Sequence, residues 1–221
     1  WSGPFRLPFA DLHLRARTDY QVLGPRDLIL FLTAQKTNDR EGRPFCARTR
    51  TGGKYWNQFA WIGPEPASGY SIMPSSVRLP GGDLLAALRR RDNDPKQHNF
   101  IELFRSRNGG LNWQRLARPV PENGAHSGNP PSMVRLADGR LCITCANRDE
   151  PRTIYAVFSS DDGATWGHQH VLRRGAGEPD IGYTRTVQRP DGRLVTIYYW
   201  LDEPRSERYI AATTWSAPKT D

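Results

Sequence analysis

Two turn motifs recur along the chain at one shared spacing, and this repetition constrains the fold more than any other feature. The first motif has the pattern Ser/Thr-x-Asp/Asn/Thr-x-Gly-x-x-Trp and occupies residues 49–56, 106–113 and 159–166. Its glycines, Gly53, Gly110 and Gly163, are 57 and 53 residues apart. Self-similarity at a fixed period is typical of repeat architectures, in which each repeat is one supersecondary unit.

The second motif is a short turn that interleaves with the first, at residues 80–84, 137–141 and 190–194. Its leucines, Leu84, Leu141 and Leu194, show the same steps of 57 and 53, and Leu28 lies 56 residues upstream of Leu84. Gly-Gly and Asp-Gly pairs tolerate the positive φ that tight hairpins need. Two turn signals with one period predict four antiparallel strands per repeat, which is a propeller blade.

The residues of the first motif have a structural explanation. A short oxygen-bearing side chain can bond the amides of its own turn, as Asn108 and Asp161 would, while the tryptophan packs beneath. We therefore predict an all-β fold, a β-propeller of four-stranded antiparallel blades. The single domain would span residues 1–221, with blades at roughly 18–62, 70–120, 128–173 and 181–215.

The first motif resembles the Asp-box (BNR) repeat of the sialidase (neuraminidase) superfamily, and we call it the Asp-box below. The phrases at residues 128–132, 182–185 and 208–213 are similar to bacterial sialidase-like members. The resemblance covers nearly all of the chain from about Thr18 onward. It implies a carbohydrate-active propeller, of which the four visible blades would be part of a ring of six or seven.

Charge and composition narrow the choice of partner. The formal net charge is +8, which favours an anionic partner. Lys and Arg are scattered, and the signatures of nucleic-acid binding are absent, so we expect no nucleic acid. We also expect no membrane span, because no apolar run is long enough. Together with the resemblance, this predicts an acidic glycan as partner.

The sequence gives no reason to expect a cofactor or a metal site. The histidines have no carboxylate or cysteine at metal-ligand spacing, and the three cysteines are interpreted as buried thiols. The chain begins at Trp1 and shows no signal peptide, so a secreted or periplasmic location is inferred from the substrate class alone. The oligomeric state is left open.

Blade geometry predicts the face that carries the site. Both turn motifs lie on one face of a propeller, so divergent loops are expected on the other face, near the axis. That face receives the starts of the first strands and the loops after the second strands. The substrate-binding candidates there are Arg91, Arg148, Arg185, Lys36, Tyr70 and Asp180. The catalytic candidates are Tyr183, His126 and Asp92.

Three functions remain open at this point. Arginines can hold a sugar carboxylate by forked hydrogen bonds, as the resemblance to sialidases implies. An exo-acting glycosidase would use Tyr183 or Tyr199 with Glu178 or Glu203, and Asp92 as acid. A uronate lyase would instead use Tyr183 or His126 to remove a proton. The third possibility is a propeller that binds glycan without turning it over.

Overall fold

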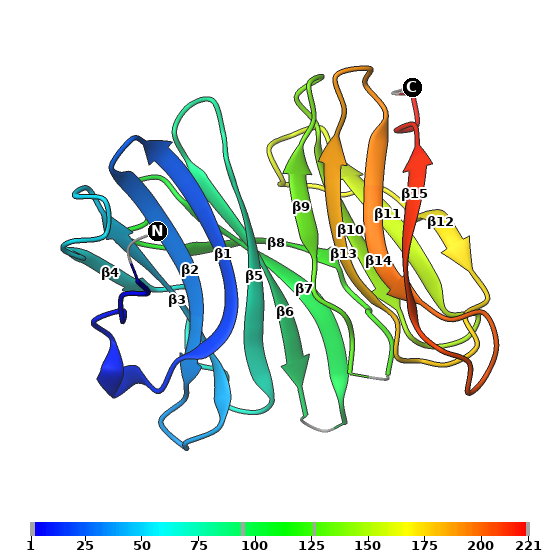
Figure 1. Cartoon of the computed structure of the whole chain (residues 1–221), viewed down its shortest axis with the longest axis horizontal. Coiled ribbons are helices and arrows are strands. Elements are labelled where there is room, and N and C mark those ends of the chain that lie inside the picture. Colours follow the sequence, from blue (N-terminus) through cyan, green and yellow to red (C-terminus); the bar gives the residue numbers. More distant parts are fainter. Residues whose placement is uncertain (1–2, 94–95, 126, 220–221) are drawn as a thin grey trace.

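The computed structural model describes residues 3–93, 96–125 and 127–219, and these residues form four antiparallel sheets (Figure 1). The first sheet holds β1(Arg15–Gly24), β2(Asp27–Gln35), β3(Glu41–Thr49) and β4(Gln58–Trp61). The second holds β5(Tyr70–Arg78), β6(Leu84–Asp92), β7(His98–Ser106) and β8(Gln114–Val120). The third holds β9(Ser132–Arg135), β10(Leu141–Asn147), β11(Thr153–Ser159) and β12(His170–Arg174). The fourth has three strands, β13(Gly182–Gln188), β14(Leu194–Trp200) and β15(Tyr209–Trp215).

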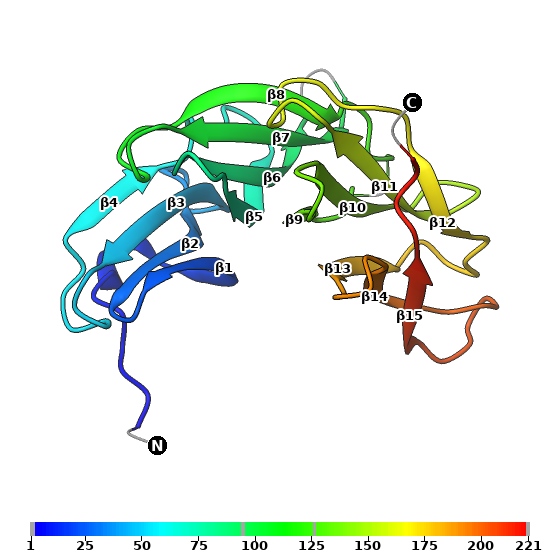
Figure 2. The same ribbon diagram turned by 90° about the horizontal axis from the view of Figure 1, so that it is seen from above.

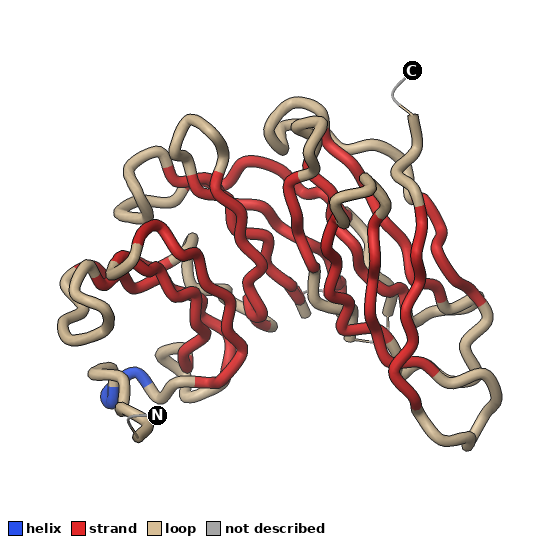
Figure 3. Tube along the Cα trace, turned by 45° about the horizontal axis from the view of Figure 1, so that its top comes forward, coloured by secondary structure: helices blue, strands red, loops and turns tan. Residues whose placement is uncertain are grey.

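The four sheets are the blades of a β-propeller, so the predicted fold class is confirmed. Within each blade the strands follow one another from the inside to the outside, with β1, β5, β9 and β13 innermost. Seen from above, the blades stand along an open arc around a common axis (Figure 2). The tube in Figure 3 shows one short helical turn among the described residues, the 3-10 helix Ala10–Leu12.

The Asp-boxes close the turns between the third and fourth strands as the sequence predicts. In blade three, the Ser159 hydroxyl accepts the Gly163 amide at 2.9 Å, and the Asp161 carboxylate accepts the Thr165 amide at 2.9 Å. The Trp166 indole donates to the Gly163 carbonyl at 3.0 Å. Blade two repeats the pattern with Asn108 in place of aspartate. Each turn is thus satisfied by its own side chains.

Adjacent blades are joined at their innermost strands by a repeated hydrogen bond, which we call the inter-blade clasp. In each clasp, a side-chain oxygen accepts the backbone N–H of the next innermost strand. The donor and acceptor pairs are Ser76 N to Asp19 Oδ2 at 2.5 Å, Met133 N to Ser75 Oγ at 2.9 Å and Thr186 N to Ser132 Oγ at 3.1 Å. The acceptors occupy equivalent positions of their blades, as the strand registers show.

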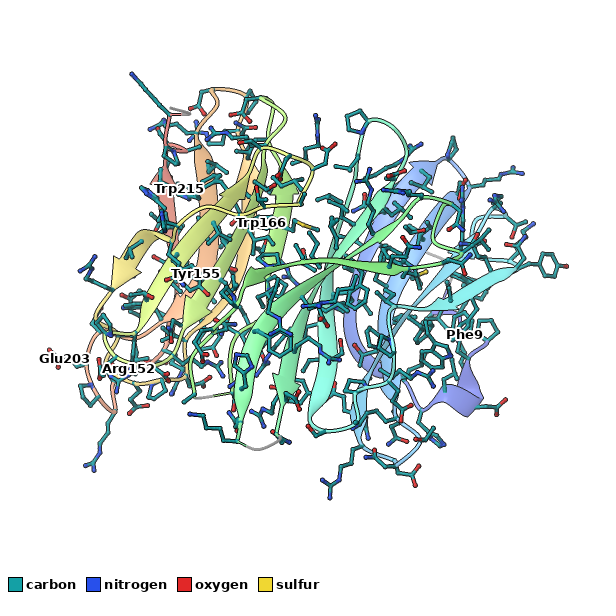
Figure 4. The ribbon with its side chains drawn as sticks, turned by 180° about the vertical axis from the view of Figure 1, so that it is seen from behind. Phe9, Arg152, Tyr155, Trp166, Glu203 and Trp215 are labelled. Carbon is teal, nitrogen blue, oxygen red and sulfur yellow. The ribbon has the colours of Figure 1, made fainter. Side chains whose placement is uncertain are left out.

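Apolar side chains fill the space between blades. Leu85 and Ile101 of blade two pack against Ile143 and Tyr155 of blade three in the largest of these cores. Trp166 covers the edge of the same core. At the other end, Phe9 of the N-terminal segment packs on blade one, as Figure 4 shows. Burial of this apolar surface is the main stabilising term of the arc.

The two end faces of the arc are not covered by another blade. Val187, Ile197 and Ile210 of blade four are exposed, and so are Tyr20 and Val22 of blade one. Ala87 and Thr144, the equivalents of Ile197 in blades two and three, are buried between sheets. Among the described residues, no helix is long and apolar enough to cross a membrane.

The Asp-box of blade three gives a test of the turn chemistry. Asp161→Ala removes the acceptor of the Thr165 amide and should lower the free energy of unfolding by about 1 kcal/mol. Asp161→Asn keeps an acceptor, as Asn108 does in blade two, and should retain most of that stability. Chemical denaturation measures the free energy of unfolding of both variants. Equal losses for the two substitutions would contradict the assigned hydrogen bond.

The pH dependence provides a second readout on the same residue. Burial alone would raise the pKa of Asp161, but hydrogen bonds from Thr165 and Ser159 outweigh it, so the pKa lies below its usual range. A carboxylate with a lowered pKa stabilises the folded state at neutral pH and loses this contribution as pH falls through the folded pKa. The stability difference between wild type and Asp161→Asn should therefore narrow in acid. A difference that stays constant down to strongly acidic pH would contradict this.

Candidate functional site

The innermost strands β5 and β13 carry bulges at equivalent positions, and each bulge places a side chain in the wall of a cavity near the axis. The register shifts between Ile72 and Ser75 in β5, and between Gly182 and Arg185 in β13. Met73 and Tyr183 lie in these bulges with φ values of 53° and 52°. A positive φ is uncommon for residues other than glycine, and such conformations gather at functional sites.

The bulges face a central cavity of about 690 Å³, which is within the size range of small-molecule sites. Its walls come from strands of blades one, two and four and from the loop that precedes β9. The lining residues are Arg15, Thr18, Glu41, Met73, Pro74, Pro130, Pro131, Tyr183 and Arg185. Two guanidinium groups, one carboxylate and one phenol thus border the same space. This composition suits a polar, negatively charged ligand.

A buried polar network holds the Tyr183 bulge in place. The Asn129 side chain, fully buried, accepts the Tyr183 amide at 3.0 Å and donates to the Ile181 carbonyl at 2.9 Å. Asn123 donates to the Asn129 carbonyl at 2.9 Å and accepts the Tyr155 hydroxyl at 3.0 Å. Figure 4 shows Tyr155 within blade three. Satisfied networks of this kind rigidify the groups that they hold.

Glycine is required beside Tyr183 because of the same network. Gly182 has a φ of 107°, and a Cβ on it would lie 2.5 Å from the Asn129 amide nitrogen. The sequence Gly182-Tyr183 is therefore a structural unit in which the glycine allows the close approach.

Arg89 places a buried positive charge behind the cavity wall. The residue is only 6% exposed, and its Nε and Nη2 atoms donate to the Ser127 carbonyl at 3.1 and 2.5 Å. Its Nη1 lies 3.4 Å from the sulfur of Met73, which lines the cavity. Among the described residues, no carboxylate forms an ion pair with Arg89. Burying a charge without a counter-charge is costly, and an anion in the cavity would offset part of that cost.

Arg148, Asp180 and Tyr183 are brought together beside blade four, around Tyr199. The Arg148 guanidinium forms an ion pair with Asp180 at 3.2 Å and donates to the Tyr199 hydroxyl at 2.9 Å. Tyr199 in turn donates to Asp180 at 2.5 Å, and its ring lies 5.8 Å from that of Tyr183. Burial and the bond to Asp180 raise the pKa of Tyr199 above its ordinary value. The Tyr199 hydroxyl is thus engaged by both Arg148 and Asp180, and Tyr199 does not border the cavity.

Arg91, Tyr70 and Asp92 lie together in blade two. The Arg91 guanidinium lies 4.8 Å from the centre of the Tyr70 ring, and the Tyr70 hydroxyl donates to the Ser127 carbonyl at 3.0 Å. Asp92 accepts a hydrogen bond from Ser68. None of the three borders the central cavity itself.

The remaining candidates have separate places. The Lys36 ammonium is buried in blade one and donates to the Pro66 carbonyl at 3.2 Å, apart from the cavity lining. His126 lies outside the described residues. Glu178, a possible partner of the catalytic tyrosine, forms an ion pair with Arg208 at 3.0 Å. Of the predicted site residues, Tyr183 and Arg185 are the two that line the cavity.

Sequence reasoning missed Arg15, Glu41 and Arg89. Arg15 precedes the predicted start of blade one. Glu41 opens the third strand of that blade, which is not among the positions predicted to carry the site. Arg89 has a weak signal, since three consecutive arginines end an otherwise apolar strand, Leu84–Asp92. Strand alternation sends Arg89 and Arg91 to the same side, so the placement of Arg91 also indicates the direction of Arg89.

The cysteines offer no reactive group. Cys46, Cys142 and Cys145 are all buried and unpaired. Burial raises the pKa of Cys46 and Cys145 to about 11 and that of Cys142 to about 12, so all three remain thiols at neutral pH. Within the described part of the chain, no group of His, Cys, Asp and Glu side chains is placed to hold a metal ion.

Comparison with known families and structures agrees with the propeller fold. Residues 17–196 match the family model described as a BNR repeat-like domain. No protein with a curated description matches the chain.

Several solved propellers share the fold at low sequence identity. An α-L-arabinanase of Penicillium chrysogenum, complexed with arabinobiose, is 17% identical with a TM-score of 0.66, covering 91% of this chain and 64% of its own. An α-L-arabinofuranosidase of Fusarium graminearum, with an iminosugar inhibitor, is 14% identical with a TM-score of 0.69, covering 94% and 63%. A polysaccharide lyase, bound to a glucuronate-containing ulvan fragment, is 12% identical with a TM-score of 0.59, covering 84% and 44%. The chain thus spans less than two thirds of these structures, and the likeness shows the fold alone.

The Asn129 network predicts a positioning effect on Tyr183. Asn129→Ala removes the acceptor of the Tyr183 amide, so the bulge should relax and affinity for a cavity ligand should fall about tenfold. Asn129→Asp keeps an oxygen acceptor and should lose less of this affinity. Titration with labelled oligogalacturonate measures the affinity.

Asp161→Ala is the matched control, because it weakens blade three on the opposite face. It should leave the affinity unchanged. Equal affinity in Asn129→Ala and wild type, in protein shown to be folded by circular dichroism, would contradict the positioning role.

Proposed function

The chain belongs to the BNR repeat-like family, and from that premise we propose that it acts on an acidic glycan in the central cavity, as an exo-acting, sialidase-like glycosidase. The observation that carries the proposal is the meeting of Arg15, Arg185, Glu41 and Tyr183 around one cavity. The family and the fold alone would not choose a reaction, because one fold hosts many activities.

The charges of the cavity support an acidic sugar. Arg15 and Arg185 both border it, and guanidinium groups bind carboxylates through forked, charge-assisted hydrogen bonds. Arg89 adds a buried positive charge behind the wall. Glu41 is the single carboxylate of the lining. A uronic or sialic acid would therefore meet more positive than negative charge there.

The size of the cavity supports action at a chain end. A volume of about 690 Å³ suits a small ligand more than a long polymer segment. The solved arabinofuranosidase and arabinanase, which bind an iminosugar and arabinobiose, share this fold. They are the analogy for a small sugar bound to this fold, and the acidic substrate is proposed from the arginines.

Tyr183 and Glu41 would share the chemistry of hydrolysis. In the proposed reaction, the Tyr183 hydroxyl attacks the anomeric carbon while Glu41 takes its proton, and an acid protonates the departing glycosidic oxygen. Water then attacks the anomeric carbon and gives its proton to the conjugate base of that acid, while the Tyr183 oxygen leaves and regains its proton from Glu41. Asp92 and His126 are the proposed acids, and because Asp92 lies outside the cavity lining, it would serve a leaving group that extends beyond the cavity toward blade two. Tyr199 is not assigned this role, because it does not border the cavity and its hydroxyl is bonded to Arg148 and Asp180.

A uronate lyase is the second candidate. The feature of the cavity that favours it is the pair of arginines, Arg15 and Arg185. Arginines beside the carboxylate would stabilise the carbanion formed when Tyr183 removes the proton next to it. The solved lyase with this fold is bound to a glucuronate-containing fragment. Either substrate is extracellular, and for that reason we propose a secreted or periplasmic location.

Product analysis on sialosides and uronate oligosaccharides tests the reaction. Hydrolysis releases reducing sugar, whereas elimination also creates an ultraviolet absorbance at the unsaturated uronyl end. We expect sugar release without new absorbance. New absorbance would overturn hydrolysis in favour of the lyase, and binding without either product would leave a glycan-binding propeller.

Two substitutions assign the roles. Arg185→Ala should weaken substrate binding by roughly tenfold to a hundredfold, and Arg185→Lys by less, because it loses the forked contact but keeps the charge. Tyr183→Phe should keep affinity and lower kcat by at least about a hundredfold.

Arg189→Ala is the matched control, since Arg189 lies just beyond the same strand and pairs with Asp191 on the surface. This variant should leave both the substrate affinity and kcat unchanged. Full turnover in Tyr183→Phe would contradict the assigned chemistry.

A further inference from the structure

A basic surface with exposed aromatic rings lies at the Asp-box of blade one, at the opposite end of β1 from the central cavity. Two adjoining hollows of about 660 and 480 Å³ share Gly52, Lys54 and Tyr55. The first also includes Phe5 and Arg6, and the second includes Arg26 and Arg50. We call the side chains of Phe5, Arg6, Arg26, Arg50, Lys54 and Tyr55 the Asp-box platform.

The aromatic rings of the platform are exposed to solvent, and the fold does not require aromatic side chains at these positions. Tyr55 is 72% exposed and Phe5 is 84% exposed, which is unusual for large apolar side chains. The turn uses only the Tyr55 backbone, whose amide donates to the Thr51 hydroxyl at 2.9 Å. The corresponding residue of the blade two Asp-box is Asn112, so the repeat itself does not require an aromatic residue here.

The cations of the platform are not held in close ion pairs, although Arg50 lies near enough to Asp27 to help lower the pKa of that carboxyl. Among the described residues, no carboxylate forms an ion pair with Arg6, Arg26, Arg50 or Lys54. Asp27, which follows Arg26 in the chain, is held instead by a forked contact with Arg48 at 2.7 and 2.6 Å. That contact lowers the pKa of Asp27, so the carboxylate stays ionised and paired with Arg48. The platform therefore keeps its positive charge available for a ligand.

Local contacts fix the parts of the platform relative to one another. The Gly52 amide donates to the Arg26 carbonyl at 2.9 Å, which ties the Asp-box to the β1–β2 hairpin. On the other side, the ring of Trp56 lies 6.0 Å from that of Phe9, which anchors the N-terminal segment that carries Phe5 and Arg6. A site with preset geometry loses less entropy when it binds.

From this arrangement we propose that the Asp-box platform is a second binding site, for an acidic polysaccharide. Tyr55 and Phe5 offer apolar faces for sugar rings, and the four cations offer charge-assisted hydrogen bonds to uronate or sulfate groups. The choice of a polysaccharide rests on the proposed function, because a site on the far face would retain a polymer whose end is processed in the central cavity.

Titration in the Arg185→Ala background, where the central cavity is weakened, isolates the platform. The probe is a labelled oligogalacturonate, with a neutral arabinan oligosaccharide and single-stranded oligothymidylate as comparisons. We expect binding to the uronate that weakens about tenfold in the double variant Arg26→Ala/Arg50→Ala and several-fold in Tyr55→Ala, and that falls with added salt. Arg107→Ala, at the equivalent position of the blade two Asp-box, should have little effect.

The outcomes separate this inference from the proposed function. Platform variants that weaken uronate binding support the inference even if the central cavity shows no turnover. No uronate binding in the Arg185→Ala background, equal affinity in the platform variants, or tighter binding of oligothymidylate would each overturn it. In otherwise wild-type protein, the platform variants should leave turnover of a short substrate unchanged, and a loss of that turnover would also contradict a separate site.

Discussion

The arrangement of this chain depends on the inter-blade clasp, in which an innermost-strand side chain accepts the backbone N–H of the next blade. Asp19, Ser75 and Ser132 play this part in turn, so each blade is positioned by its predecessor at the axis. The residue two before Ser75, Met73, and the equivalent residues of blades three and four all reach the cavity. The bond that spaces the blades therefore also sets the walls of the site.

Blade four lacks the clasp acceptor and has a cavity-lining arginine in its place. The position equivalent to Asp19, Ser75 and Ser132 is occupied by Arg185, which is a donor and cannot accept an amide proton. Its side chain borders the cavity beside Tyr183 instead. Together with the buried charge of Arg89, this gives the axis a positive character that the scaffold does not need. Positive charge that is buried without a counter-charge costs free energy of folding. An anion bound in the cavity would offset part of that cost.

The repeats predicted the fold because turn chemistry and strand period are local properties of the sequence. They also placed Tyr183 and Arg185 near the axis, since the start of a first strand must lie there. The bulges at Met73 and Tyr183 were not predictable, because a positive φ in such residues is imposed by tertiary contacts such as Asn129. Arg15, Glu41 and Arg89 were missed for a similar reason, since alternation gives a side chain's direction but not the cavity that it meets.

The central claim is that the cavity at the axis binds the acidic group of a glycan through Arg15 and Arg185. A crystal structure of the chain with a uronate oligosaccharide tests it most directly. The account predicts the carboxylate of the terminal sugar within hydrogen-bond distance of both guanidinium groups, with the sugar ring against Tyr183. A terminal sugar bound in the cavity with its carboxylate turned away from both arginines, or an empty cavity at saturating ligand, would contradict it.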